Sequence, residues 1–299
     1  MKFCKIRNQK SHKLLTVSGG PIVDQVPVGS RENMAEIQQY TDRGRLNQQW
    51  LSFPLQGSER SYSCRATGKV LDVRGSLSAN GTVIQQYERN GGHNQAWLPE
   101  LGSDGLFVLI SRVDLGEMVL DVPGGLTDDG VTIQLYDAND GLNQKWTIEE
   151  VEVGEAVQIK NRESQRVLDV PGFLSDNGTK IQQYDSNYGT NQLWSITRDR
   201  AGWGEIISMA SDKALDVPLD KGHEKVTIQL YTRNSGQNQH WQIRDLGNGY
   251  VEIASQISGG AMVLDVPDSL HDPGVLIQQS QRNGGENQQW QLIPFTPPI

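Results

Sequence analysis

The chain has 299 residues, with 36 acidic and 27 basic side chains and a formal net charge of −9. This acidic balance argues against a nucleic-acid binder, because that class needs a Lys/Arg surface to displace counterions from phosphate. The longest wholly apolar run, residues 106–110, is far shorter than the roughly 20 residues of a membrane-spanning helix.

The start of the chain carries no apolar segment of the kind that a secretory signal contains. We therefore expect a protein that stays in the cytoplasm or leaves the cell by a non-classical route. Two cysteines, Cys4 and Cys64, are too few for a disulfide scaffold. One bridge between them is conceivable, but free thiols are the expectation.

A motif, Asn-Gln-x-Trp, occurs six times, at intervals of 47, 49, 48, 47 and 49 residues. Leu-Asp-Val precedes five of the six copies, and each of these aspartates lies 25 residues before its tryptophan. A fixed period of this length is the signature of a repeat fold. The repeats cover almost the whole chain, so no separate catalytic domain is expected. They end at Trp50, Trp97, Trp146, Trp194, Trp241 and Trp290.

Each repeat has the pattern of short strands between turns. In the third repeat the expected strands are residues 119–122, 131–136 and 146–148. Alternation places the apolar side chains on one face, and Asp121, Gln134 and Tyr136 on the other. No stretch sustains a period of 3.6 residues, which predicts an all-β protein. The pattern is imperfect, because four repeats carry a glutamine where the third has Leu135: Gln39, Gln86, Gln183 and Gln279.

Six repeats of this length fit one six-bladed propeller or two three-fold barrels, and periodicity alone does not decide between them. Leu-Asp-Val, Ile-Gln-x-Tyr and Asn-Gln-x-Trp, in that order, resemble the repeat of ricin B-chain-type (R-type) β-trefoil lectins. That family packs three repeats into each domain, so the resemblance implies two tandem β-trefoils. An acidic segment, residues 149–155, follows the third repeat and predicts lectin domains at 1–149 and 150–299.

The six tryptophans are expected in the core. One large aromatic side chain per repeat, next to a strand, is what a pseudo-symmetric core needs. The resemblance gives the tryptophan the same role. It also makes the glutamine two places earlier largely structural.

A tyrosine stands ten residues before the tryptophan in five repeats, on the face that alternation turns away from the core. Its role is either cross-strand packing or stacking on the apolar face of a sugar ring. We favour stacking, because aromatic side chains placed at the surface are enriched in binding sites. These residues are Tyr40, Tyr87, Tyr136, Tyr184 and Tyr231.

The Leu-Asp-Val aspartates share the face of the tyrosines. An ionised carboxylate can accept hydrogen bonds from two adjacent hydroxyls of a pyranose. Its alternative role is to cap backbone N–H groups in the turn that follows. A tyrosine on the same face, 15 residues later, favours the binding role. The asparagine of Asn-Gln-x-Trp can donate and accept, although asparagine before a strand is also ordinary turn chemistry.

In R-type lectins the matching aspartate, aromatic residue and asparagine hold galactose-like sugars, and a nearby glutamine assists. The resemblance therefore implies four sites, for galactose or N-acetylgalactosamine, that require no cofactor and no metal. Their residues are Asp72, Gln85, Tyr87 and Asn94; Asp121, Gln134, Tyr136 and Asn143; Asp169, Gln182, Tyr184 and Asn191; and Asp216, Gln229, Tyr231 and Asn238.

Three repeats depart from the pattern. In the first, alignment puts Thr16 at the acid position, whereas counting back from the tryptophan gives Gln25; either way the carboxylate is missing. The sixth has Ser280 in place of the tyrosine, so stacking is lost. The fifth lacks the turn glycine of its neighbours in segment 220–225, and we expect its loop to be rearranged.

Catalysis is not expected, because the histidines fall at no metal-ligand spacing and no nucleophile or phosphate-binding motif occurs. Repetition also multiplies equivalent acids, whereas a glycosidase needs one distinct pair. The expected function is multivalent binding to glycans of glycoproteins or glycolipids. Two alternatives stay open. One is a protein-binding trefoil, such as a protease inhibitor acting through segment 18–36 or 220–225. The other is the receptor-binding part of a toxin or haemagglutinin assembly; a homo-oligomer is also possible.

Overall fold

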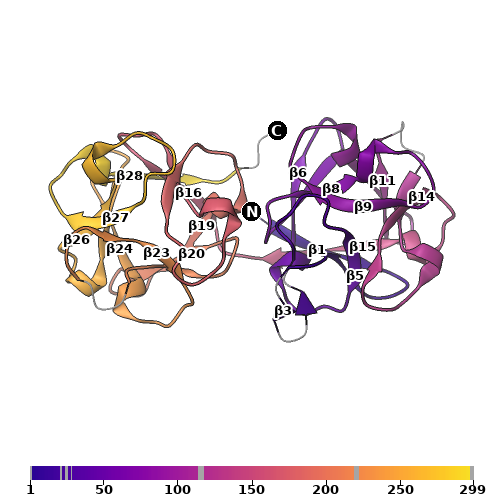
Figure 1. Ribbon diagram of the computed structural model, residues 1–299, viewed down its shortest axis with the longest axis horizontal. Helices are drawn as coiled ribbons and strands as arrows, with labels where there is room; N and C mark the ends of the chain where they lie inside the picture. Colours follow the sequence, from indigo (N-terminus) through magenta and orange to yellow (C-terminus); the bar gives the residue numbers. More distant parts are fainter. Residues whose placement is uncertain are drawn as a thin grey trace. The chain divides into compact units, whose positions relative to one another are not determined.

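The computed structural model describes residues 2–20, 22–23, 26–27, 29–113, 118–218 and 222–296 (Figure 1). Its described residues form β-strands joined by turns and single 3-10 turns. They separate into two compact units, residues 2–153 and 154–296. No described segment is a helix that is long and apolar enough to cross a membrane. Gln25, one of the two candidates for the first acid position, lies outside the described residues.

The first unit contains β1 (Lys2–Asn8), β2 (Leu14–Val17), β3 (Ile22–Val23), β4 (Val26–Pro27), β5 (Ile37–Tyr40), β6 (Trp50–Pro54), β7 (Arg60–Cys64), β8 (Val70–Val73), β9 (Thr82–Tyr87), β10 (Trp97–Leu101), β11 (Phe107–Ser111), β12 (Met118–Asp121), β13 (Val131–Thr132), β14 (Gln134–Asp137) and β15 (Trp146–Glu152). A 3-10 turn precedes each Asn-Gln-x-Trp tryptophan: η1 (Leu46–Gln48), η3 (His93–Gln95) and η5 (Leu142–Gln144). Two more follow Leu-Asp-Val: η2 (Arg74–Ser76) and η4 (Pro123–Gly125).

The second unit contains β16 (Ala156–Asn161), β17 (Val167–Asp169), β18 (Gln182–Tyr184), β19 (Trp194–Ile196), β20 (Trp203–Ser208), β21 (Ala214–Asp216), β22 (Val226–Thr227), β23 (Gln229–Tyr231), β24 (His240–Asp245), β25 (Val251–Ser255), β26 (Met262–Asp265), β27 (Gln278–Gln281) and β28 (Trp290–Pro294). Its 3-10 turns are η6 (Pro171–Phe173), η7 (Thr190–Gln192), η8 (Gln237–Gln239), η9 (Gln256–Ser258), η10 (Pro267–Ser269) and η11 (Glu286–Gln288).

Strand pairing closes a ring within each set of three repeats. In the first unit β1, β6, β7, β10, β11 and β15 pair in sequence, and β15 returns to pair with β1. In the second, β16, β19, β20, β24, β25 and β28 close in the same way. Hairpins such as β8–β9 and β12–β14 extend from these barrels. Closure after three repeats makes each unit a β-trefoil and excludes the six-bladed propeller.

Strand β15 runs through the boundary expected at residue 149. It continues to Glu152, because Val151 and Glu152 pair with Phe3 and Lys2 of β1. The first unit accordingly ends at Val153 and the second begins at Gly154. Residues 149–152 of the acidic segment therefore belong to the last strand of the first barrel, and the two units join between Val153 and Gly154.

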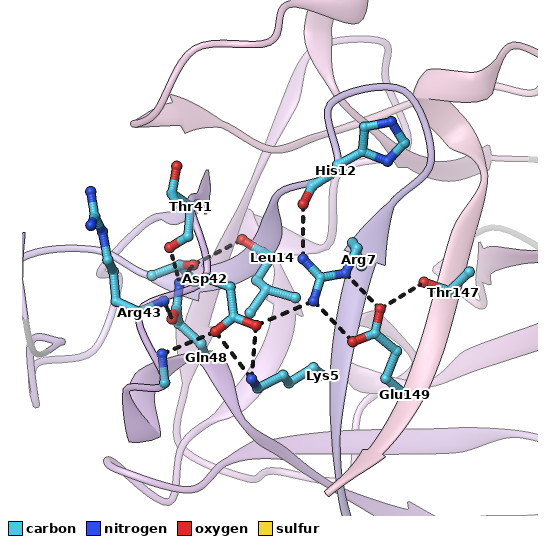
Figure 2. A network of polar contacts seen from close by, with 12 residues as sticks. Lys5, Arg7, His12, Leu14, Thr41, Asp42, Arg43, Gln48, Thr147 and Glu149 are labelled. Atoms are coloured by element: carbon cyan, nitrogen blue, oxygen red, sulfur yellow. Dashed lines mark hydrogen bonds and ion pairs between the residues drawn. The ribbon is translucent and has the colours of Figure 1, made fainter.

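A network of ion pairs connects the side chains of β15 and β1 (Figure 2). Arg7 of β1 donates through Nε and Nη2 to the Glu149 carboxylate, at 2.5 and 2.9 Å. Its Nη2 also reaches Asp42 at 3.2 Å, and Lys5 holds that carboxylate at 2.8 Å. The hydrogen bond from Arg7 lowers the pKa of Glu149. Charges of both signs thus stabilise the closure of the first barrel.

The six tryptophans lie in the two cores, as expected, with exposures between 0 and 2 %. Each indole Nε1 donates to the carbonyl of the leucine that precedes the repeat's acid position; Trp146 donates to Leu120 at 3.1 Å. The ring is therefore buried and its polar atom is satisfied. Cys4 and Cys64 are free and buried, and burial raises the pKa of the Cys4 thiol to about 12.

The four glutamines that interrupt the apolar pattern link neighbouring repeats. Gln39 Nε2, in the first repeat, donates to the carbonyls of Leu126 and Asp128 in the third, at 2.9 and 3.0 Å. Gln183, in the fourth repeat, makes the same pair of bonds to the sixth. Gln86 and Gln279 likewise donate to turns of the preceding repeat. Buried glutamine is tolerated here because its amide is hydrogen-bonded.

Candidate functional site

The second repeat shows how the site is built. Antiparallel pairing sets Asp72 of β8 opposite Gln85 of β9. Asp72 Oδ1 accepts from Gln85 Nε2 at 2.8 Å. Oδ2 accepts from Asn94 Nδ2 at 2.6 Å and from Gln95 Nε2 at 3.0 Å, both from η3. A strand hairpin and the turn before the tryptophan therefore converge on one carboxylate.

The same constellation recurs in the third to sixth repeats, with hydrogen bonds of 2.6–3.0 Å. The donors always lie 13, 22 and 23 residues after the acid. The structure thus brings together the aspartate, glutamine and asparagine of every predicted site. The members are Asp121, Gln134, Asn143 and Gln144; Asp169, Gln182, Asn191 and Gln192; Asp216, Gln229, Asn238 and Gln239; and Asp265, Gln278, Asn287 and Gln288.

These hydrogen bonds limit what the carboxylate can still accept. A carboxylate offers about four lone-pair positions, and three side-chain amides already occupy three of them at Asp72. The aspartates are also 2–3 % exposed. Both oxygens of Asp72 therefore already accept hydrogen bonds from the protein's own amides. About one position, on the oxygen held by a single amide, stays open while the three amides remain in place.

Burial sets the electrostatics of the carboxylates. It raises the pKa of Asp72, and hydrogen bonds from Gln85 and Gln95 oppose this rise only in part. Burial likewise raises the pKa of Asp169, Asp216 and Asp265. A raised pKa means that the folded state holds the proton more tightly than the unfolded chain does. Stability from these groups is therefore present at low pH and is lost as pH rises through the folded pKa.

The tyrosines of the predicted sites lie beside these networks. Tyr136, Tyr184 and Tyr231 are 37, 42 and 37 % exposed, and Tyr87 is half-buried. In the second repeat the tyrosine lines a hollow of about 410 Å³. The hollow is formed by Met34, Asp72, Arg74, Gly75, Gln85, Tyr87, Asn90 and Asn94. An aromatic face thus adjoins a buried carboxylate and its amides.

The glutamine of Asn-Gln-x-Trp, which the resemblance makes largely structural, is part of the hydrogen-bond network around the acid. Gln95 Nε2 donates to Asp72 and also to the Glu88 carbonyl at 2.8 Å. Its Oε1 accepts the N–H of Asn90 at 2.9 Å. The glutamine therefore orients both the acid and the loop that carries the asparagine. Its constant distance from the acid in the sequence was a signal for this role.

A glycine two residues before the site asparagine was also missed. At Gly92 and Gly141 an added Cβ would lie 2.4 Å from the asparagine Oδ1, which is closer than real contacts allow. Gly189, Gly236 and Gly285 show the same approach. The first repeat, which lacks the acid, has Arg45 at this position. These glycines let the asparagine reach the carboxylate.

The first and sixth repeats lack part of the constellation. Thr16 of β2 pairs with Gln38 of β5, just as Asp72 of β8 pairs with Gln85 of β9 in the second repeat. Thr16 therefore occupies the acid position of the first repeat. Its hydroxyl donates to the Leu14 carbonyl at 2.8 Å. The sixth repeat keeps the whole amide network, but Ser280 stands where the tyrosine should be.

The fifth-repeat loop, for which a rearrangement is expected, is described only at residues 222–225. Lys225 adopts a φ of 60°, in the left-handed region where Gly130 has 84°. Its N–H donates to the Gln279 carbonyl at 2.8 Å, and Gly130 donates to Gln39 in the same way. At this one position, a lysine thus keeps the left-handed backbone and the hydrogen bond of the turn glycine. Asp220 lies outside the described residues.

Within the described ranges, no group of three or more His, Cys, Asp or Glu side chains is placed to hold a metal ion.

Family models match both units. The model described as "Ricin-type beta-trefoil lectin domain" matches residues 155–290. The model described as "Ricin-type beta-trefoil lectin domain-like" matches residues 2–87, 61–136 and 93–184. No curated protein matches the sequence.

Three solved structures illustrate the likeness. The designed three-fold symmetric protein ThreeFoil is 31 % identical, covers 47 % of this chain and 99 % of its own, and has a TM-score of 0.46. The C-half of the earthworm R-type lectin, in complex with GalNAc, is 28 % identical; the match covers 47 % of this chain and 99 % of the earthworm chain, with a TM-score of 0.38. The Macrolepiota procera ricin B-like lectin, in complex with lactose, is 25 % identical; the match covers 49 % of this chain and 94 % of the Macrolepiota chain, with a TM-score of 0.40.

Two closed three-repeat barrels with a recurring amide-held carboxylate define a β-trefoil binding protein with two domains in tandem. The chain belongs to the ricin-type β-trefoil lectin family, and its function is carbohydrate binding.

Proposed function

We propose that the protein binds galactose-type sugars through four sites, in the second to fifth repeats. One observation carries the proposal: the Asp–Gln–Asn–Gln network recurs beside a tyrosine in these four repeats. The tyrosine is not required to hold the network together, because the sixth repeat keeps the same network with Ser280 at the tyrosine position.

Each proposed site offers two kinds of contact. The tyrosine ring stacks on the apolar face of a pyranose. The open position of the carboxylate accepts one hydroxyl proton, and the asparagine and glutamine amides supply donors and acceptors for a neighbouring hydroxyl. Galactose or N-acetylgalactosamine is the sugar that family membership favours.

Multivalency supplies the affinity. A shallow site of this kind binds near millimolar, or roughly −4 kcal/mol. Several sites on one chain that engage one branched glycan, or the glycoproteins and glycolipids of one surface, raise the effective concentration and the avidity. The proposal assigns these sites binding and no chemical step, because each acid is equivalent to three others and none forms a distinct pair.

A glycan array tests the proposal. The wild-type protein is compared with a four-site variant that carries Asp72→Asn, Asp121→Asn, Asp169→Asn and Asp216→Asn. Asp265→Asn is the matched control, because it alters the same network in the repeat without a tyrosine. We expect the wild type and Asp265→Asn to bind a coherent set of galactose-bearing glycans, and the folded four-site variant to bind none. If the wild-type protein bound no glycan on the array, that result would contradict sugar binding and favour a protein-binding trefoil.

A further inference from the structure

A turn of the second repeat holds the tyrosine-bearing strand of the third. The N–H of Gly81 donates to the carbonyl of Leu135 at 3.0 Å, just before Tyr136. The side chain of Asn80 holds the residue after the same tyrosine, because its Oδ1 accepts the N–H of Asp137 at 2.8 Å. Both peptide groups that flank Tyr136 are therefore fixed by another repeat. We call these two contacts the inter-repeat clasp.

The clasp recurs in a cycle around the first unit. In the third repeat, Asp129 Oδ1 accepts the N–H of Thr41, which follows the tyrosine of the first repeat, at 2.7 Å. In the first repeat, Asn33 Oδ1 accepts the N–H of Glu88, which follows the tyrosine of the second, at 3.1 Å. The backbone bond to the carbonyl before the tyrosine is present in both cases. Each tyrosine of this unit is thus held by the turn of a neighbouring repeat.

In the second unit the clasp is complete around Tyr231. Asn177 Oδ1, in the fourth repeat, accepts the N–H of Thr232 at 2.9 Å, and the backbone bond before the tyrosine is also present. The same oxygen accepts from the Thr232 hydroxyl at 3.0 Å and from Lys213 Nζ at 2.7 Å. Asp129 makes the same three kinds of contact in the first unit. A carboxylate therefore serves this position as well as an amide does.

Around Tyr184 one half of the clasp is missing. The N–H of Gly274, in the sixth repeat, donates to the Gln183 carbonyl at 2.8 Å. The side-chain position is occupied by Pro273, whose ring offers no acceptor for the N–H of Asp185. Of the two peptide groups that flank Tyr184, this turn therefore holds one.

We propose that Asn33, Asn80 and Asn177 are positioning residues for the sugar sites of the second, third and fifth repeats. The inference rests on the proposed sugar binding. A ring whose backbone is fixed on both sides loses less conformational freedom when a sugar stacks on it, so affinity rises. Each of these sites accordingly depends on a residue of the neighbouring repeat, and the fourth-repeat site lacks such a residue.

The test begins with the fifth-repeat site alone. In a background with Asp72→Asn, Asp121→Asn and Asp169→Asn, calorimetric titration measures the affinity of this site for methyl galactoside. We expect Asn177→Ala to lower the affinity about two- to tenfold, the range that one hydrogen bond supports. Asn177→Asp is expected to restore it, because Asp129 already serves the equivalent position with the same contacts.

The fourth-repeat site supplies the control. In a background with Asp72→Asn, Asp121→Asn and Asp216→Asn, it alone keeps its carboxylate among the proposed sites. Asn177 belongs to this repeat, but its clasp contact goes to the fifth. Asn177→Ala is therefore expected to leave the fourth-repeat affinity unchanged, whereas a general loosening of the unit would weaken both sites.

A graft in the control background tests the incomplete clasp. Pro273→Asn supplies the missing acceptor for the N–H of Asp185. The following Gly274 has a φ of 88°, which matches the 89° of Gly178 after Asn177, so the backbone already suits the graft. We expect the affinity of the fourth-repeat site to rise about two- to tenfold.

The outcomes distinguish this inference from the proposed function. An unchanged fifth-repeat affinity in Asn177→Ala, or an equal loss at the fourth-repeat site, would overturn the positioning role while sugar binding stands. Pro273→Asn without a gain in affinity would count against it in the same way. If neither background bound methyl galactoside and the wild-type protein bound no glycan on the array, both would fail.

Discussion

Replacing Trp146 or Tyr136 by alanine removes an aromatic ring from the same repeat with opposite expected consequences. Trp146 is fully buried, and its Nε1 satisfies the Leu120 carbonyl. Truncation leaves a cavity and an unpaired acceptor, so we expect a loss of about 3–5 kcal/mol. For a unit of this size that lowers Tm by roughly 10 to 15 °C. Tyr136 is 37 % exposed, and its removal costs about 1 kcal/mol or less.

Binding should change in the opposite order. Loss of the Tyr136 stacking surface is expected to weaken the third-repeat site about five- to tenfold, the effect of roughly 1 kcal/mol of aromatic contact. Differential scanning calorimetry and sugar titration at a temperature where both variants are folded measure the two effects. Equal melting losses, or a Trp146→Ala variant that loses sugar affinity while Tyr136→Ala keeps it, would refute the division into scaffold and site.

Further predictions concern pH, the turn glycines and the buried glutamines. Sugar binding at the second, fourth and fifth repeats is expected to fall as acid protonates Asp72, Asp169 and Asp216, because burial raises the pKa of these three carboxyls; titration from pH 7 downward checks this, and affinity independent of pH would contradict it. Gly141→Ala is expected to weaken the third site at least tenfold by displacing Asn143, whereas Gly154→Ala, with its nearest atom at 3.5 Å, is a neutral control. Gln39→Leu removes the donor of the Leu126 and Asp128 carbonyls and is expected to destabilise the first unit by about 1–3 kcal/mol. Urea unfolding measures this loss, and an unchanged unfolding midpoint would contradict it.

Much of the fold could be predicted because the six repeats act as an internal alignment. The fixed 25 residues between acid and tryptophan, together with strand alternation, place Asp121 and Gln134 on one face, and the structure joins them by a hydrogen bond of 2.7 Å. The core position of the tryptophans follows from the same periodicity.

What could not be predicted depends on distant partners. Gln39 looks like an error in an apolar strand until the third repeat, 87 residues away, supplies its acceptors. The end of the first unit at Val153 follows from the pairing of β15 with the N-terminal strand. The sequence also did not show that Lys225 would adopt the left-handed backbone usual for glycine and keep the same N–H hydrogen bond.

The amide network also could not be predicted in full. Spacing placed the asparagine and glutamine near the acid, but it did not show that three amides share one carboxylate. That arrangement leaves about one acceptor position open. A sugar hydroxyl would therefore meet the carboxylate together with the amides that surround it.

The most direct test of the central claim is the binding stoichiometry of methyl galactoside by isothermal titration calorimetry. Four equivalents per chain are predicted for the wild type and for Asp265→Asn, and none for the folded four-site variant. A four-site variant that binds as many equivalents as the wild type would contradict the assignment of these carboxylates to sugar sites.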